Sequence, residues 1–257
     1  MSEEFVAGRN SVAEALRSGR SINKILVAKG DRQGSIREII GKARDQGIVV
    51  QETDPAKLDQ LATGVRHQGI LALLAPVPYV DVGDILHNAA AHGEIPFLVL
   101  LEELEDPHNV GAIMRTADAA GVHGLLLPKR RTSPITATVA KTSAGAVEYV
   151  PVARIGNVVQ TLKELKKQGF WIIGADMDGS QNYYNADLTG PVVVVVGSEG
   201  KGMGRLTKEA CDVLVRIPMK GKIGSLNASV ACSLLLYEVL RQRELKDHCP
   251  GGSSVSQ

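Results

Sequence analysis

The polar residues of two glycine-dense stretches near the C-terminus are the strongest candidates for chemistry. The first stretch, VGSEGKGMG at 196–204, closes a run of five valines, and the second, IPMKGKIGSLNASVA, spans 217–231. Glycines at this density indicate backbone that turns tightly and lies close to a bound group. Loops after strand ends are where α/β proteins usually bind ligands. Both stretches are therefore predicted to be ligand-binding loops.

The first loop does not follow either common nucleotide-binding scheme. A P-loop would close in Gly-Lys-Ser or Gly-Lys-Thr, whereas Gly202 is followed by Met203. The dinucleotide fingerprint, which opens a helix after the first strand of a βαβ unit, is absent as well. Glu199 in this loop could steer a bound group or pair with an arginine. The alternative is that Glu199 is a solvated residue in an ordinary strand-to-helix turn.

The second loop ends in two polar residues, Ser225 and Asn227. Asn227 directly precedes the last predicted helix, so an N-cap is its simplest role. In an extended or turning loop, both side chains can point at one ligand. Lys220 and Lys222 lie in the same loop and could neutralise a phosphate.

A third polar pair lies upstream in LEELEDPHNVGAIMRTADAAGV, at 101–122. Asn109 fits the N-cap of an alanine-rich helix that ends at Gly121 as the C′ residue. Arg115 stands in a mostly apolar part of this helix, where a guanidinium is costly unless it meets an anion. A salt bridge to Glu199 or another acid and a substrate phosphate remain alternatives of equal weight.

The chain around these loops alternates strands and helices from Pro96 onward. The strands are almost continuously apolar, which is typical of parallel strands buried on both faces, so a doubly wound α/β domain is predicted. The predicted strands are 97–102, 122–127, 170–176, 192–197 and 212–218, and the predicted helices lie near 109–120, 136–144, 156–168, 204–211 and 228–246.

The N-terminal residues are predicted to form a small α/β unit. Strands are expected at 22–28, 48–52 and 69–75. Helices are expected to begin at two capping boxes, Ser11 with Glu14 and Ser35 with Glu38, and at the N-cap pair Asp54-Pro55.

Composition shifts divide the chain into four predicted parts. A small domain at 1–75 is followed by a linker at 76–95, which is richer in proline, glycine and polar residues. The large domain spans 96–246. The tail at 247–257 has the composition of a disordered segment.

Composition also limits the class of protein. The chain has 257 residues, 44% of them apolar, and a net charge of +1, so any nucleic-acid surface must be a local patch. No stretch approaches the roughly 18 apolar residues of a membrane span, and the N-terminus has no apolar signal region. Cys211, Cys232 and Cys249 favour neither a disulfide framework nor a zinc site. A cytoplasmic protein without a metal is expected.

The segments 101–122, 196–204 and 217–231 together resemble the three ordered motifs of the SPOUT-class RNA ribose 2′-O-methyltransferases, the TrmH/SpoU family. The region of about 96–245 looks like the catalytic domain of that family. The first 75 residues resemble the L30e/L7Ae-like RNA-binding domain of the bacterial 23S rRNA guanosine 2′-O-methyltransferases. The fold that the resemblance implies is a parallel-sheet α/β domain with a C-terminal trefoil knot.

The resemblance carries the family's catalytic polar residues onto Asn109, Arg115, Glu199, Ser225 and Asn227. A guanidinium essentially never deprotonates in proteins. Arg115 is therefore expected to hold a phosphate and stabilise charge on the 2′-oxygen rather than act as a base.

The resemblance also implies a cofactor and partners. S-adenosylmethionine is expected in a pocket formed by backbone at Gly197, Ile217 and Leu226. A homodimer is expected through the catalytic domain, with the final helix contributing. The expected substrate is a guanosine ribose in 23S rRNA. Two alternatives remain: a tRNA ribose or another rRNA site, and a non-catalytic RNA-binding or ribosome-assembly factor.

Overall fold

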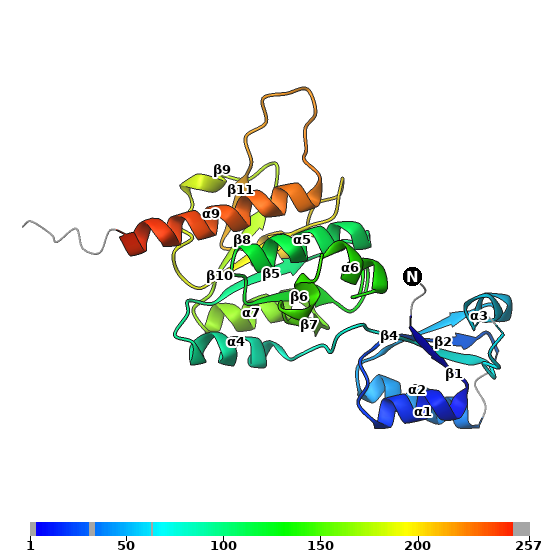
Figure 1. Ribbon diagram of the computed structural model, residues 1–257. Coiled ribbons are helices and arrows are strands. Elements are labelled where there is room, and N and C mark those ends of the chain that lie inside the picture. The colour runs from blue at the N-terminus through cyan, green and yellow to red at the C-terminus, as the bar shows by residue number, and fades with distance from the viewer. Residues whose placement is uncertain (1–3, 31–33, 63, 249–257) are drawn as a thin grey trace, which may run out of the picture.

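The computed structural model describes residues 4–30, 34–62 and 64–248. Two α/β domains follow one another along the chain, the smaller one N-terminal (Figure 1). The tail predicted at 247–257 begins inside the last helix, and residues 249–257 lie outside the described part of the chain.

The N-terminal domain is built on a four-stranded sheet with the order β1-β4-β2-β3. Strand β2 runs parallel to β3 and antiparallel to β4, which pairs antiparallel with β1. Helices α1 and α2 pack on one face and α3 on the other. The elements are β1 (Phe5–Ala7), α1 (Arg9–Arg17), β2 (Ile22–Ala28), α2 (Ser35–Asp45), β3 (Val49–Thr53), α3 (Pro55–Ala62) and β4 (Ile70–Leu74).

The predicted strands of this domain are confirmed, whereas both capping boxes are wrong. Helix α1 begins at Arg9 and α2 at Ser35, and in each case the N-cap is a glycine without a side chain to accept a hydrogen bond. Gly8, at the turn into α1, has a φ of 92°, a positive value that glycine adopts without strain. This turn starts α1 earlier, so that Ser11 falls inside its first turn. The start of α3 at Pro55 is confirmed.

The C-terminal domain contains a seven-stranded sheet with the order β7-β6-β5-β10-β8-β11-β9, and all of its strand pairs are parallel. All five valines of β10 are buried at its centre. The strands are β5 (Phe97–Leu101), β6 (Gly124–Pro128), β7 (Val152–Ile155), β8 (Trp171–Ala175), β9 (Gln181–Asn182), β10 (Val192–Val196) and β11 (Val213–Arg216).

Helices cover both faces of this sheet (Figure 1), as predicted for a doubly wound domain. Helices α5, α6 and α9 lie on one face, and α4, α7 and α8 lie on the other. Their bounds are α4 (Val82–Ala91), α5 (Pro107–Ala119), α6 (Ala137–Thr142), α7 (Val158–Lys167), α8 (Arg205–Ala210) and α9 (Ala228–His248), with 3₁₀ turns at Ala146–Glu148 and Tyr183–Asn185.

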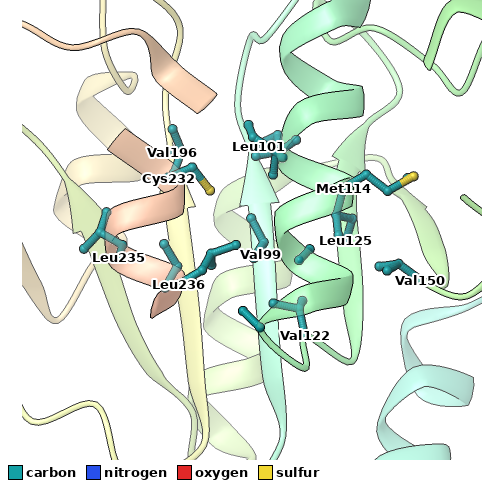
Figure 2. Packing of buried hydrophobic residues seen from close by; sticks show 14 of the residues in the cluster. Val99, Leu101, Met114, Val122, Leu125, Val150, Val196, Cys232, Leu235 and Leu236 are labelled. Atoms are coloured by element: carbon teal, nitrogen blue, oxygen red, sulfur yellow. The ribbon is translucent and has the colours of Figure 1, made fainter. Parts of the chain in front are cut away.

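The core beneath α5 and α9 fixes the two central strands that carry the candidate loops. Val99 and Leu101 of β5 and Val196 of β10 meet Met114 of α5 and Leu236 of α9 in one buried cluster (Figure 2). Fully burying a side chain of this size contributes roughly 1.5–3 kcal/mol. The strand ends before the loops are therefore held rigidly.

The segment 76–95, predicted to be a linker, contains helix α4. Ile85 and Ala89 of this helix are buried, and Ile85 packs into the core of the C-terminal domain. Gly124 makes room for it, because a Cβ there would lie 2.6 Å from the Ile85 Cδ1. The sequence pattern does not predict this helix because the segment is short and rich in alanine. Its Ile85 contact with the core forms only in the tertiary structure.

A buried polar contact joins the two domains. The Asn23 side chain, in a residue only 6% exposed, donates from Nδ2 to the Ile135 carbonyl at 2.8 Å. The Tyr79 hydroxyl donates to Asn23 Oδ1 and accepts from the Ile135 backbone N–H. The domains thus dock through specific hydrogen bonds.

No helix in the described residues is long and apolar enough to cross a membrane. The trefoil knot stays a prediction.

Candidate functional site

Three loops converge at the carboxyl end of the parallel sheet. They follow β5, β10 and β11, and they lead into α5, α8 and α9. Because β5 and β10 are neighbours, the residues after Leu101 and Val196 lie side by side. Ligands of open α/β sheets bind at this edge.

Glu199 is the centre of a hydrogen-bonded cluster that links all three loops. Its Oε1 accepts from Asn109 Nδ2 at 3.0 Å, from Asn227 Nδ2 at 2.6 Å and from the Ala228 backbone N–H at 3.3 Å. Asn227 Nδ2 also donates to Asn109 Oδ1 at 3.0 Å. Hydrogen bonds to a charged acceptor are about twice as strong as neutral ones. Glu199 is thus an exposed turn residue whose contacts are with amide groups of the other two loops rather than with an arginine.

Asn227 combines the predicted N-cap with this cluster. Its Oδ1 accepts from the backbone N–H of Ser229 at 2.9 Å and of Val230 at 3.4 Å, which caps α9. Its Nδ2 remains free to donate to Glu199 and Asn109.

The N-cap role predicted for Asn109 is wrong. Helix α5 begins at Pro107 and is capped by Asp106, whose Oδ1 accepts from the His108 N–H at 2.8 Å. Asn109 therefore lies in the first turn, 7% exposed, with its amide directed to Glu199. The predicted C′ role of Gly121, with φ at 70°, is confirmed.

A cavity of about 270 Å³ opens beside this cluster. Five of the residues singled out from the sequence line it, and they come from the loops after β10 and β11: Gly197, Glu199, Ile217, Ser225 and Leu226.

The loop 197–204 forms one wall of the cavity and is fixed by its own hydrogen bonds. The backbone N–H of Ser198 donates to the Gly202 carbonyl at 3.1 Å, and the Gly202 N–H returns a bond of 2.9 Å. Gly200 and Gly202 have φ of 83° and 66°. A Cβ at Gly197 would lie 2.2 Å from the Gly202 carbonyl carbon, so glycine is required for this close backbone approach.

The loop after β11 forms the opposite wall and is open. Residues 217–226 make no hydrogen bond with any other described residue. The loop stands out from the body of the domain (Figure 1), and its residue Ile223 is 74% exposed. Its backbone N–H and C=O groups are therefore free to bind a ligand.

Both domains match known families. The SpoU rRNA Methylase family matches residues 96–237, and the family described as RNA 2′-O ribose methyltransferase substrate binding matches residues 5–80. The chain belongs to the TrmH/SpoU family of RNA methyltransferases. The expected combination of a substrate-binding domain and a SPOUT domain is thereby confirmed.

Individual relatives agree over most of the chain. The Bacillus subtilis protein YacO, assigned to the TrmH family of tRNA/rRNA methyltransferases, is 48% identical over 240 residues, 93% of this chain and 96% of YacO. An AdoMet-bound rRNA methyltransferase from Sinorhizobium meliloti superposes with a TM-score of 0.58, at 25% identity over 92% of this chain and 86% of that one. The TrmH/SpoU tRNA modifying enzyme of A. aeolicus gives a TM-score of 0.56, at 34% identity over 63% and 83%.

Arg115 is not among the described residues that line the cavity. It is on the exposed side of α5, and its guanidinium forms no ion pair or hydrogen bond within the described ranges. The apolar neighbours Ile113, Met114 and Ala117 point into the core instead. The predicted burial cost and the salt-bridge alternative are therefore wrong, because consecutive helical residues point about 100° apart.

The sequence reasoning missed two charged residues in the cavity, Asp176 and Lys208. Their carboxylate and ammonium groups lie 2.6 Å apart, and the Asp176 side chain is only 5% exposed. An acidic residue at the end of the apolar strand predicted at 170–176 was the available signal. Among the described residues, no cluster of three or more His, Cys, Asp or Glu side chains could hold a metal ion.

Proposed function

We propose that this protein transfers the methyl group of S-adenosylmethionine to a ribose 2′-hydroxyl, specifically that of a guanosine in 23S rRNA. The observation that carries the proposal is the Asn109–Glu199–Asn227 cluster beside the cavity. Its members lie far apart in the sequence and belong to the motifs through which the chain resembles ribose methyltransferases. A non-catalytic RNA-binding protein would not need this cluster at the edge of a cavity.

The residues around the cavity fit the methyl donor, which supplies a methyl group already activated by the sulfonium charge. The backbone groups of Ile217 and Leu226 have no partner among the described residues, so they can bind its polar edges. Gly197 allows close approach of the backbone on the other side. The Sinorhizobium meliloti relative with AdoMet bound supports this cofactor.

The chain's own task is alignment and charge stabilisation. Glu199 would hold the amides of Asn109 and Asn227 in one orientation beside the reacting groups, and Ser225 would contact the ligand from the open loop. Arg115 would bind an RNA phosphate, since its exposed guanidinium is available for a bidentate contact. In that position it would stabilise negative charge developing on the 2′-oxygen.

Assembly and location are part of the same proposal. Apolar side chains on α9 that are 38–54% exposed support a homodimer through this helix. They are Val230, Leu234, Tyr237 and Leu245. A structured RNA substrate implies a cytoplasmic protein.

The test is methyl transfer from tritiated S-adenosylmethionine to 23S rRNA from a strain that lacks the native methylation, followed by mapping of the labelled nucleotide. We expect label at one guanosine 2′-oxygen, loss of label in Arg115→Ala and partial activity in Arg115→Lys. A lysine variant as inactive as the alanine variant would contradict a purely electrostatic role.

A tRNA target is the second candidate, favoured by the likeness to the A. aeolicus tRNA modifying enzyme. Label on tRNA and none on 23S rRNA would select it. Absence of cofactor binding would instead favour a non-catalytic RNA-binding factor.

A further inference from the structure

We propose that Asp176 binds the ribose hydroxyls of the methyl donor and that Lys208 holds the Asp176 carboxylate in position. This inference rests on the proposed function, because it assumes that the cavity takes S-adenosylmethionine. It adds a specificity-determining residue from a strand that none of the three motifs contains.

The first argument is the position of Asp176 between the two loops of the cavity. It directly follows β8, which lies between β10 and β11 in the sheet. Its backbone N–H donates to the Val215 carbonyl at 2.9 Å, which fixes it beside the strand that leads into the open loop. In open α/β sheets, an acidic residue near the carboxyl end of a strand commonly binds the ribose of a nucleotide.

The second argument is the hydrogen-bonding capacity that the carboxylate has left. Asp176 Oδ1 accepts from the Asp178 backbone N–H at 3.0 Å, and Oδ2 contacts Lys208 Nζ at 2.6 Å. An ionised carboxylate has about four acceptor sites. Gly202 lies next to this carboxylate, since a Cβ there would be in ordinary van der Waals contact with Oδ2 at 3.8 Å.

The third argument is charge. Lys208 neutralises Asp176 within the cavity wall, and its side chain is 33% exposed. A second cation would gain little from an acid that is already paired, which disfavours the α-ammonium group of the cofactor as the partner. Two neutral hydroxyl donors match the remaining acceptor sites, so the ribose diol is the group that fits.

Calorimetric titration of the full-length protein tests this without relying on turnover. The probes are S-adenosylhomocysteine, 5′-methylthioadenosine, which lacks the amino-acid end, and the 2′,3′-dideoxy form of S-adenosylhomocysteine. We expect Asp176→Asn to weaken both diol-containing probes by the same factor, about 10- to 100-fold. The dideoxy probe should bind the wild type and the variant equally. Asp118→Asn, an exposed change on α5 at a residue that does not line the cavity, is the matched control.

Two results would overturn the assignment. If Asp176→Asn weakens S-adenosylhomocysteine and leaves 5′-methylthioadenosine unchanged, the carboxylate binds the amino-acid end. If the wild type binds the dideoxy probe as tightly as S-adenosylhomocysteine, no side chain hydrogen-bonds to the ribose hydroxyls. This comparison uses only the wild-type protein, so it does not depend on whether a variant folds. A wild type that binds none of the probes would remove the proposed function itself.

Discussion

The two loops around the cavity are both rich in glycine, but one is closed by hydrogen bonds and the other is open. The loop 197–204 is closed by the backbone pair between Ser198 and Gly202 and is tied to two helices through Glu199. The loop 217–226 has no hydrogen bond to another described residue and protrudes from the domain. One wall of the site is therefore preorganised, and the other can be ordered by whatever binds.

This difference matches two separate requirements of the site, a fixed catalytic geometry and access for a ligand. Catalytic groups have to be held in a fixed geometry before the substrate arrives, since alignment lost at that stage reduces the rate. A ligand has to enter and leave, which favours a segment with few contacts of its own. Changes in the first loop should therefore alter the rate or the fold, and changes in the second should alter binding.

The largest effect is expected from removing the Glu199 hydrogen bonds that connect the loops. Glu199→Ala removes the acceptor shared by Asn109, Asn227 and the Ala228 N–H. The methylation rate should fall by roughly 10²–10³-fold, the cost typical of losing one preorganised group. Single-turnover rates measure it, with Glu164→Ala on α7 as the control. A variant that keeps the wild-type rate would show that the cluster has no catalytic role.

The second-largest effect should come from adding a methyl group at one glycine of each loop. Gly197→Ala places a Cβ 2.2 Å from the Gly202 carbonyl carbon, whereas nothing lies within 4 Å of a Cβ at Gly221. Gly197→Ala should lower the free energy of unfolding by about 3 kcal/mol. Gly221→Ala should leave it nearly unchanged. Thermal unfolding of the two variants tests the contrast, and equal midpoints would contradict it.

Ligand binding should then reduce the difference in amide hydrogen exchange between the two loops. With S-adenosylhomocysteine at roughly 100 times its Kd, amide hydrogen exchange in 217–226 should slow by at least about tenfold, within the linkage limit of roughly 2.7 kcal/mol. The amides of Ser198 and Gly202, already bonded to each other, should change less. Stronger added protection at 198–202 would reverse the assignment of fixed and open walls.

The smallest effect is expected from one exposed cation of the open loop. Lys222→Ala should weaken RNA binding about equally for all sequences and reduce the salt-dependence slope by about 1. Filter binding at several salt concentrations measures this, and Lys163→Ala on the opposite face is the control. An unchanged slope would place the RNA away from this loop.

Much of the fold could be predicted because apolar runs report buried strands directly. β5, β8, β10 and β11 lie inside their predicted ranges, and β6 is shifted by one or two residues. The elements that were missed are β1 and β9, which are very short, β7, which carries the charged Arg154, and α4, whose apolar side is narrow. Such patterns carry little local signal and depend on their neighbours for stability.

The site was predictable in its membership and less so in its contacts. Gly197, Ile217 and Leu226 do meet at one cavity. The sequence predicts that Asn109 caps α5, but Asp106 provides that cap. It also predicts apolar surroundings for Arg115, which is exposed instead. Local sequence gives the type of each residue, but helix phase and the exact helix start decide where its side chain points.

The sequence by itself determined that the chain has buried parallel strands ending in glycine-rich loops, because that pattern depends on residues close together in the chain. Only the tertiary structure decided that Asn109, Glu199 and Asn227 share hydrogen bonds across separations of 90 and 118 residues. It also decided that Asp176 stands between the two loops. The order of the strands sets which loop ends are neighbours, and that order is selected by packing of the whole sheet rather than by any local segment.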